Sequence, residues 1–341
     1  MPYDALYARL TEDLAAREVC ALPDGSVDRY YHVTDAAGER IRTREAFLDR
    51  LATDGTRSLT LAPQGVRPGG QAVNAARQAA ALGGAVHLVG HLDAPPLGPF
   101  DFPTVSLGEP ATVHVLSFEA DDLLLSVESE DLQTWRIEDV FTALPASPES
   151  WLADSVLVLQ NWVGLPGMTD ALRTLAGREP TPATVVFDPG DVTSAGAGPL
   201  RELTEALGRL ARATDVVVTA NDAELAHLAA HSDVSATGPE RAAKLRTALG
   251  VDAVVRHGEQ RAVAATGELT VVENLAPDRV HRRTGAGDRF DGALAAGVAA
   301  ELSWDERLAL ANACAVAYLQ TGETATRERV RDLLAARGHA G

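Results

Sequence analysis

The sequence TGAGDRFDG, from Thr284 to Gly292, follows a strand-like stretch and opens an alanine-rich helix. Small residues at a helix start let backbone N–H groups approach an anion closely, and the helix dipole favours negative charge there. Asp288 would repel a phosphate held at such a site, but it suits a base that takes the proton of an attacking hydroxyl. The structural alternative is a glycine-rich loop with Asp288 close to the N-cap of the helix.

A second junction of strand, glycines and helix reads GGQAVN, from Gly69 to Asn74. The two glycines allow the backbone to approach a ligand closely. Asn74 would lie in the first helical turn, and its side chain can both donate and accept hydrogen bonds, as polyol hydroxyls require. The alternative is an ordinary helix start with Asn74 on a polar face.

A third motif, Asn221-Asp222-Ala223-Glu224, directly follows the apolar run 215–219. Asn221 and Glu224 are three residues apart, so they share one face of a helix start. An amide and a carboxylate there could hold the hydration shell of Mg²⁺, which prefers oxygen ligands and retains water. The alternative is plain N-capping by Asn221 or Asp222, with Glu224 in the first turn.

Strands and helices alternate from residue 155 onward, which predicts a parallel sheet covered by helices on both faces. The predicted strands cover residues 155–159, 184–187, 215–219 and 253–256. Three earlier regions of strand character, 27–33, 58–66 and 104–128, predict a small accessory sheet or lid. Apolar residues at helical spacing predict an amphipathic helix over residues 3–17.

Composition excludes several classes of function. The 341 residues contain 30 Lys and Arg against 48 Asp and Glu, a net charge of −18, which argues against nucleic-acid and anionic-membrane partners. No apolar run could span a bilayer, and residues 1–19 lack a signal-peptide pattern. The two cysteines form no disulfide framework, so we expect a reducing cytoplasm. Lys244 is the only lysine, a bias that either a GC-rich genome or salt adaptation would produce.

Other catalytic motifs are absent from the sequence. It contains no HExxH, no GxSxG and no GxxxxGK[ST], and no GxGxxG follows the first predicted strand. A dinucleotide-dependent oxidoreductase is therefore a weak alternative. Any phosphate cradle must use backbone amides and arginines.

Taken together, the three motifs resemble the ribokinase-like (PfkB) carbohydrate kinase family, over about residues 20–320. The resemblance implies a doubly wound α/β fold with a small β lid. It also implies phosphorylation of a sugar, nucleoside or sugar-phosphate hydroxyl with ATP and Mg²⁺. On this basis residues 18–341 form the kinase domain, and residues 1–17 form an N-terminal helical extension.

The resemblance assigns a role to each matching position. Asp288 would be the base, and the anion hole for the transferred phosphoryl group would consist of Gly285, Ala286 and Gly287. Asn221 and Glu224 would hold Mg²⁺ through water, and Asn312 would lie beside the adenine. The acceptor would be bound by Gly69, Gly70, Asn74 and Asp28, with Asp24 as the alternative to Asp28.

Two stretches depart from the family pattern. Arg282 and Arg283 stand where relatives have Asp-Thr, whose Asp helps to bind a monovalent cation. A guanidinium there would replace that cation or contact a phosphate, and we count both arginines as substrate-binding candidates. The family's Thr-x-Gly reads Arg256-His257-Gly258 here, so Arg256 and Gly258 become the candidates for binding the ATP phosphates.

These observations predict an ATP-dependent kinase that acts on a hydroxyl of a pentose-type sugar or sugar phosphate, with ribose 1-phosphate favoured. A nucleoside kinase of the same fold is the alternative, and a non-catalytic sensor on this fold is the rival from another class. We further expect a homodimer through the lid, and we attribute the acidic composition either to salt adaptation or to GC bias.

Overall fold

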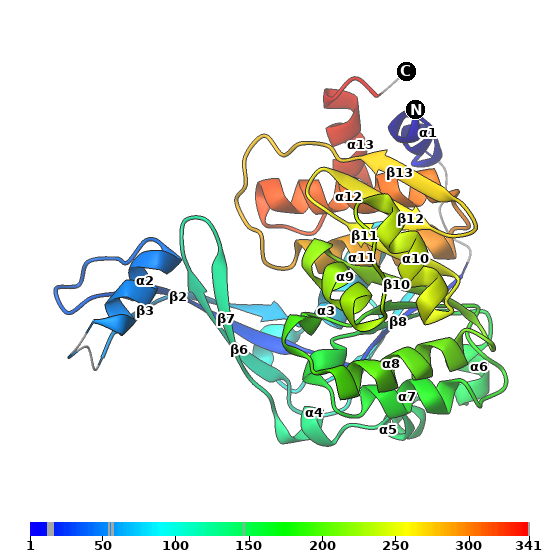
Figure 1. The fold of residues 1–341 in the computed structure, drawn as a ribbon, viewed down its shortest axis with the longest axis horizontal. Coiled ribbons are helices and arrows are strands. Elements are labelled where there is room, and N and C mark those ends of the chain that lie inside the picture. Colours follow the sequence, from blue (N-terminus) through cyan, green and yellow to red (C-terminus); the bar gives the residue numbers. More distant parts are fainter. Residues whose placement is uncertain (12–16, 54, 56–57, 146, 340–341) are drawn as a thin grey trace.

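Two β-sheets organise the chain (Figure 1). Among the described residues, the larger sheet has nine strands in the order β13-β12-β11-β10-β9-β8-β1-β4-β5, and the smaller has four in the order β3-β2-β6-β7. The structure is a computed structural model and describes all residues except 12–16, 54, 56–57, 146 and 340–341. Strands from β11 to β5 run parallel, whereas β12 and β13 add an antiparallel hairpin at one edge.

The parallel strands are apolar on both faces because helices cover both sides of the sheet. Strand β8 reads VLVLQ and is buried throughout. The strands of the larger sheet are β1 (Val19–Leu22), β4 (Val86–Gly90), β5 (Thr104–Ser106), β8 (Val156–Gln160), β9 (Thr184–Asp188), β10 (Asp215–Ala220), β11 (Ala253–His257), β12 (Arg261–Ala265) and β13 (Leu269–Glu273).

Helices pack against this sheet in two apolar cores. One core contains residues of α1 (Pro2–Arg9), α3 (Gln71–Ala81), α11 (Ala286–Ala299), α12 (Trp304–Thr321) and α13 (Arg327–Ala336). The other contains residues of α4 (Glu130–Thr134), α5 (Ile137–Ala143), α6 (Pro148–Leu152), α7 (Met168–Leu175), α8 (Ala197–Leu210), α9 (Asp222–His231) and α10 (Pro239–Leu249). Short 3₁₀ helices are η1 (Pro95–Leu97), η2 (Trp162–Gly164) and η3 (Val192–Ser194). The predicted doubly wound fold is confirmed.

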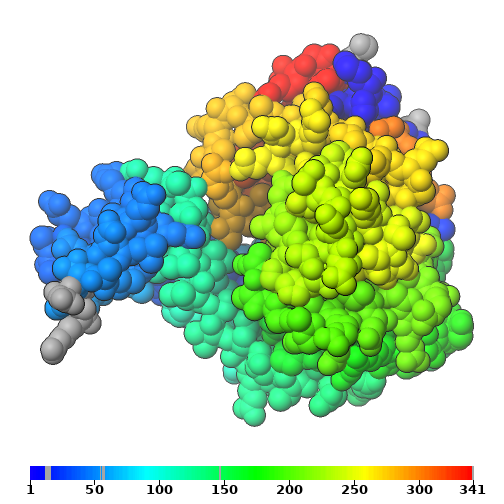
Figure 2. Space-filling view, viewed as in Figure 1, coloured from blue at the N-terminus to red at the C-terminus, as the bar shows by residue number. Residues whose placement is uncertain are grey.

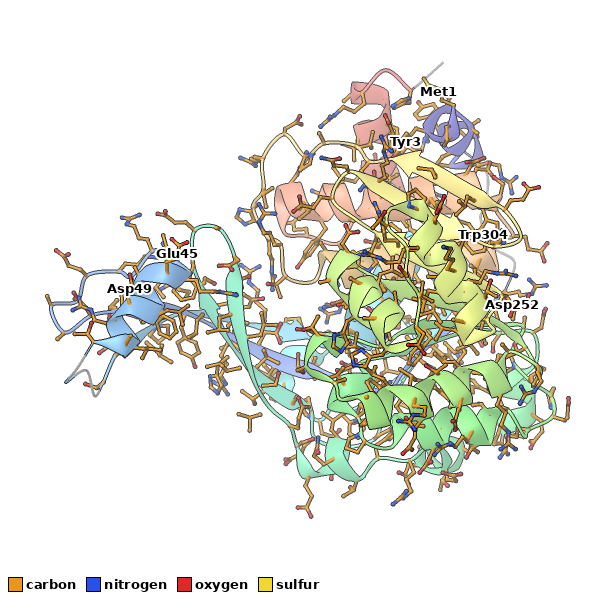
Figure 3. The ribbon with its side chains drawn as sticks, in the orientation of Figure 1. Met1, Tyr3, Glu45, Asp49, Asp252 and Trp304 are labelled. Atoms are coloured by element: carbon orange, nitrogen blue, oxygen red, sulfur yellow. The ribbon has the colours of Figure 1, made fainter. Side chains whose placement is uncertain are left out.

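The smaller sheet forms a lid that projects from one side of the body, with α2 (Arg44–Ala52) at its far end (Figures 1 and 2). Its strands are β2 (Ser26–Thr34), β3 (Thr60–Gly69), β6 (Ala111–Ser117) and β7 (Asp122–Val127). Strand β2 covers the predicted strand 27–33, and β3 overlaps the predicted strand 58–66 over residues 60–66. Of the predicted region 104–128, residues 104–106 form β5 of the larger sheet instead, because they pair with β4. Glu45 and Asp49 on α2 point away from the body (Figure 3).

The first helix packs into the body. Tyr3, Leu6 and Leu10 are buried in the core that also holds α11 and α12, and Tyr3 lies close to the C-terminal helix (Figure 3). The predicted helix over residues 3–17 is observed as α1 over Pro2–Arg9, and residues 12–16 of that prediction lie outside the described part of the chain. Of the described helices, none is both long and apolar enough to cross a membrane.

Candidate active site

Polar residues follow the carboxyl ends of parallel strands, where open α/β sheets bind their ligands. Asp24 follows β1, Asn161 follows β8 and Asn221 follows β10. Together with lid residues they line a cavity of about 890 Å³ between the larger sheet and the lid. The cavity also contains Asp288, the predicted base, so it is the candidate active site.

Asp288 and Asn74 meet in this cavity. Asn74 Nδ2 donates a hydrogen bond to Asp288 Oδ2 over 2.7 Å. Each residue lies in the first turn of its helix, α11 and α3 respectively. These helices pack closely because α11 has a glycine at the contact: a Cβ on Gly292 would lie 2.3 Å from the carbonyl oxygen of Ala75. The helix pair thus brings the predicted base and the predicted acceptor-binding amide together.

The predicted anion hole lies at the start of α11. Gly285 is the N-cap residue and has a φ of 90°, a conformation that favours glycine. The N–H of Ala286 donates to the carbonyl oxygen of Arg283 over 3.1 Å, so this amide is already engaged. Gly287 and Asp288 follow in the first turn, where N–H groups have no partner within the helix. The amides best suited to a phosphoryl group are therefore those of Gly287 and Asp288.

The two competing carboxylates, Asp24 and Asp28, both line the cavity but have different partners. Asp24 accepts hydrogen bonds from the backbone N–H groups of Gln71 and Ala72 and from Asn161 Nδ2, over 3.1, 2.7 and 3.1 Å. Burial raises its pKa to about 7, although the three donors oppose that shift. Asp24 therefore anchors the start of α3.

Asp28 is freer to bind an acceptor. Its Oδ1 accepts a hydrogen bond from Ser26 Oγ over 2.6 Å, and burial raises its pKa. Asp28 lies on lid strand β2 beside Gly69, where a Cβ would lie 2.2 Å from the Asp28 Oδ1 atom. Gly70 has a φ of 98°. Gly69 thus makes room for Asp28, and Gly70 allows the sharp turn into α3.

Asn221 and Glu224 form a capping box at the start of α9. Asn221 Oδ1 accepts from the N–H of Glu224 over 3.0 Å, and Glu224 Oε2 accepts from the N–H of Asn221 over 2.8 Å. Burial, with the nearby carboxylates of Asp188 and Asp191, raises the pKa of Glu224 to about 8. The capping alternative is therefore realised, and Glu224 lies in a strongly negative environment.

The carboxylates around Glu224 fit Mg²⁺ held through water. A divalent cation would offset the repulsion between Glu224, Asp188 and Asp191, and Mg²⁺ prefers oxygen ligands while retaining several waters. No cluster of three or more His, Cys, Asp or Glu side chains within the described residues could hold a metal ion directly. These side chains are therefore consistent with an ion whose ligands are mainly water molecules and substrate phosphates.

The candidate residues for the nucleotide divide between two places. Arg256 and Gly258 line a neighbouring cavity of about 470 Å³, which Asn221 joins to the cavity of Asp288. Arg256 Nε lies 3.4 Å from Asp222 Oδ1. Asn312 lies elsewhere and is buried, and its Oδ1 accepts from the Tyr3 hydroxyl over 2.6 Å. The side chain of Asn312 is thus engaged in packing α1 onto the body.

The two departing arginines lie in different environments. Arg282 lines the cavity of Asp288 and donates a hydrogen bond to the hydroxyl of Tyr30 on the lid. Its Cζ lies 4.8 Å from the ring centroid of Tyr30 and 5.9 Å from that of Tyr318. Arg283 is exposed and lines a smaller cavity of about 210 Å³ beside the lid. Only Arg282 therefore reaches the candidate active site.

Sequence reasoning assigned no role to two residues that line the site, Tyr318 and Arg289, or to Asp291 buried behind it. Tyr318, on α12, donates a hydrogen bond from its hydroxyl to the carbonyl oxygen of Thr284 over 2.8 Å. Arg289, next to the base, donates from Nε to Thr324 Oγ1 over 3.0 Å. Asp291 is fully buried, and burial with the charge of Asp188 raises its pKa well above the usual range. Arg289 and Asp291 belong to the opening motif and could have been found there, whereas Tyr318 has no sequence signal.

Comparison with known proteins gives the family. The family model "Prokaryotic ketohexokinase" matches residues 10–336. A ketohexokinase of Haloferax volcanii is 30% identical over 315 residues, which cover 86% of this chain and 83% of the relative.

Solved structures agree on the fold. Ribokinase of Thermotoga maritima aligns with a TM-score of 0.65 at 18% identity, over 94% of this chain and 99% of its own. Phosphofructokinase-2 of Escherichia coli, in complex with substrates and products, aligns with a TM-score of 0.65 at 16% identity, over the same shares. Ribokinase of Arabidopsis thaliana, complexed with ribose and ATP, has a TM-score of 0.60 at 20% identity, over 94% and 99%.

These matches support an enzyme rather than the non-catalytic sensor considered above. The motifs that carry the resemblance lie within the matched range, and the first helix lies outside it. The chain belongs to the prokaryotic ketohexokinase family within the ribokinase-like (PfkB) carbohydrate kinases, and it is a sugar kinase.

Proposed function

We propose that this protein transfers the γ-phosphoryl group of ATP to a hydroxyl of a ketohexose. The observation that carries the proposal is the position of Asp288, which is held by Asn74 in the first turn of α11. There it can accept the proton of an acceptor hydroxyl beside amides that can hold a phosphoryl group. The acceptor class comes from the family model and from the ketohexokinase of Haloferax volcanii.

The proposed reaction is an in-line displacement. The acceptor oxygen forms a bond to the γ-phosphorus, the bond from that phosphorus to the bridging oxygen of ADP breaks, and the hydroxyl proton passes to Asp288. The first-turn amides of Gly287 and Asp288 stabilise the charge on the transferred group. Asn74 keeps the carboxylate of Asp288 directed into the cavity, which reduces the entropy lost on reaching the reactive geometry.

The acceptor is proposed to bind on the lid side of the cavity. Asp28 and Asn161 line it there, and carboxylate and amide groups complement the several hydroxyls of a ketose. Asp24 supports this side indirectly because it holds Asn161. Binding here would place the sugar between the lid and the body.

The nucleotide is proposed to bind on the opposite side, in the cavity of Arg256 and Gly258. Mg²⁺, held through water by Asn221 and Glu224, would neutralise phosphate charge when it is bound. The location that we propose for this ATP-using enzyme is the cytoplasm, consistent with its two free and buried cysteines, Cys20 and Cys314.

A phosphorylated acceptor such as ribose 1-phosphate is the second candidate, and a nucleoside is the third. The phosphorylated acceptor is favoured by Arg282 and Arg289, which both line the cavity of Asp288. Arg289 Nη1 is buried without a hydrogen-bond partner among the described residues. A buried guanidinium of this kind would gain from a phosphate oxygen.

An acceptor panel tests these proposals. ADP release would be measured with ATP and Mg²⁺ against ketohexoses, pentoses, pentose phosphates and nucleosides, with Asp288→Asn as the matched inactive control. We expect the highest kcat/KM with a ketohexose. A higher kcat/KM with ribose 1-phosphate, lost in Arg282→Ala, would select the second candidate instead. Turnover with none of the four classes would contradict the proposed function.

We also propose that two copies pair through the lid. On the face of the lid sheet opposite Asp28, the β7 residues Leu125 and Val127 and the β3 residue Val66 are 49, 59 and 49% exposed. Arg29 and His114 lie between Val66 and Leu125 across the sheet, so a second copy would cover a mixed surface with apolar side chains at both edges. Light scattering during gel filtration should report a dimer, and Val127→Glu should convert it to a monomer. A wild-type monomer at micromolar concentration would contradict this proposal.

A further inference from the structure

Two lid residues hold the segment that leads into the candidate anion hole. This segment comprises residues 282–285 and ends at the N-cap of α11. Tyr30, on lid strand β2, accepts a hydrogen bond from Arg282 through its hydroxyl. Asp122, at the start of lid strand β7, accepts one from Thr284 Oγ1 over 2.5 Å. The lid therefore contacts the segment at two points, one on each side of Arg283.

The body holds the same segment from the other side. Tyr318 on α12 donates a hydrogen bond of 2.8 Å to the carbonyl oxygen of Thr284, and the Arg282 guanidinium lies close to the rings of both Tyr30 and Tyr318. Thr284 is thus held by the lid through its side chain and by the body through its backbone. Its position depends on how the lid and the body sit against each other.

The same lid strand carries the proposed acceptor contact. Asp28 and Tyr30 are two residues apart on β2, so their side chains point to the same face of the lid. Asp28 lines the cavity of Asp288, and Tyr30 lines the neighbouring cavity of about 210 Å³, which shares Arg282 and Asp122 with it. A sugar bound by Asp28 would therefore draw the lid toward the body and tighten the contact between Tyr30 and Arg282.

We propose that Tyr30 and Asp122 are positioning residues through which the lid sets the geometry of segment 282–285, and with it the anion hole and Asp288. The inference rests on the proposed function, since it assumes that this anion hole receives the transferred phosphoryl group. Closure over a bound acceptor would then complete the catalytic arrangement and exclude water at the same time. A displacement of about 1 Å at such a site can reduce the rate by roughly 100-fold.

Two variants remove the lid contacts, and two neighbours serve as matched controls. Tyr30→Phe removes the hydroxyl that accepts from Arg282 but keeps the ring, and Asp122→Ala removes the acceptor for Thr284. Tyr31→Phe is the first control, because Tyr31 lies on the other face of β2 and stacks on His114 at 5.7 Å. Asp121→Ala is the second, because Asp121 pairs with Arg44 within the lid at 3.0 Å.

We expect kcat to fall by about tenfold or more in Tyr30→Phe and Asp122→Ala, because each loses a hydrogen bond to a charged group. The KM for ATP should stay within about twofold, since the nucleotide binds to the body. Both controls should keep the wild-type kcat. Asp122→Asn, which retains an acceptor oxygen for Thr284, should recover most of the activity. Because both residues act on one segment, the double variant should lose less than the product of the two single losses.

A second measurement separates this inference from the proposed function. Hydrogen exchange of the amides of residues 284–288, followed without substrate, should be faster in Tyr30→Phe and Asp122→Ala than in either control. Faster exchange in an enzyme that phosphorylates no acceptor would support the lid contact and reject the assigned activity. Unchanged exchange together with an unchanged kcat in both variants would overturn the inference.

Discussion

The side chains of Asn74 and Asp288, 214 residues apart in the sequence, form a hydrogen bond of 2.7 Å at the centre of the candidate active site. Each follows a glycine that begins its helix, so the two helix starts face each other across the cavity. The donor is the Asn74 amide, which leaves Asp288 Oδ1 available to a substrate hydroxyl. This arrangement explains why both glycine junctions are needed for one reaction centre.

The first prediction concerns the proton acceptor. Asp288→Asn keeps the size of the side chain but removes the basic oxygen, so kcat should fall by about 10²- to 10⁴-fold. ATP affinity, measured by calorimetry with Mg²⁺, should be unchanged or higher, because a negative charge near the γ-phosphate is lost. A near-native kcat in a well-folded variant would remove Asp288 from the role of base.

The local parts of the site could be predicted from the sequence. Asp288, Asn74, Asn221 and Glu224 each lie where a short motif marks a helix start, and such starts depend on neighbouring residues alone. The start of α9 lies at the carboxyl edge of the larger sheet because β10 ends there. The start of α3 follows lid strand β3 and is held at the same edge by Asp24, which follows β1 and accepts from the N–H groups of Gln71 and Ala72.

The remaining parts depend on packing between distant segments. The contact of Tyr30 with Arg282 requires the lid to pack against the body, and no local sequence pattern predicts how the lid packs. Arg283 was expected beside Arg282 at the site, but it lines only the neighbouring cavity of about 210 Å³, whereas Arg282 lines both. Asn312 was expected beside adenine, and that role stays a prediction; its side-chain Oδ1 accepts hydrogen bonds from the Tyr3 hydroxyl and from the N–H of Leu275.

The second prediction concerns the room that Gly69 leaves for Asp28. In Gly69→Ala the new Cβ would lie 2.2 Å from Asp28 Oδ1, so the carboxylate must move away from the acceptor. The acceptor KM should rise by roughly 10- to 150-fold, which is the loss of one hydrogen bond to a charged group, while the ATP KM is unchanged. Gly198→Ala, where a Cβ meets nothing within 4 Å, is the control. An unaltered acceptor KM in Gly69→Ala would show that Asp28 does not bind the sugar.

The third prediction concerns pH and Asp24. Burial raises the pKa of this carboxyl from 3.8 to about 7, so the folded state binds a proton more tightly than the unfolded state does. The resulting stability is fully present below about pH 4 and is lost as the pH rises through about 7, at no more than about 1.4 kcal/mol per pH unit. The free energy of unfolding of the wild type, measured in urea, should therefore decrease between pH 5 and 7.5 relative to Asp24→Asn.

Asp24→Asn is the appropriate reference because the neutral amide cannot titrate, although it also alters the bonds to Gln71 and Ala72. That alteration changes the free energy of unfolding of the variant by an amount that does not depend on pH. The titration of Asp24, by contrast, makes the difference in free energy of unfolding between the two proteins vary with pH. Parallel pH profiles for the two proteins would mean that the hydrogen bonds from its three donors cancel the effect of burial on the pKa of Asp24.

The fourth prediction concerns salt. The net charge of −18 makes the folded chain repel itself, and at about 0.01 M salt charges interact over roughly 30 Å. Salt also weakens surface ion pairs such as Arg17 with Asp154, but exposed pairs contribute only about 0–1 kcal/mol each. The repulsion should therefore dominate, and Tm should rise from low salt to molar KCl.

NaCl, run in parallel, should give the same increase if screening is the cause, whereas a larger increase in KCl would indicate a specific cation site. A Tm that is flat in both salts would leave genomic GC bias as the explanation for the acidic, lysine-poor composition.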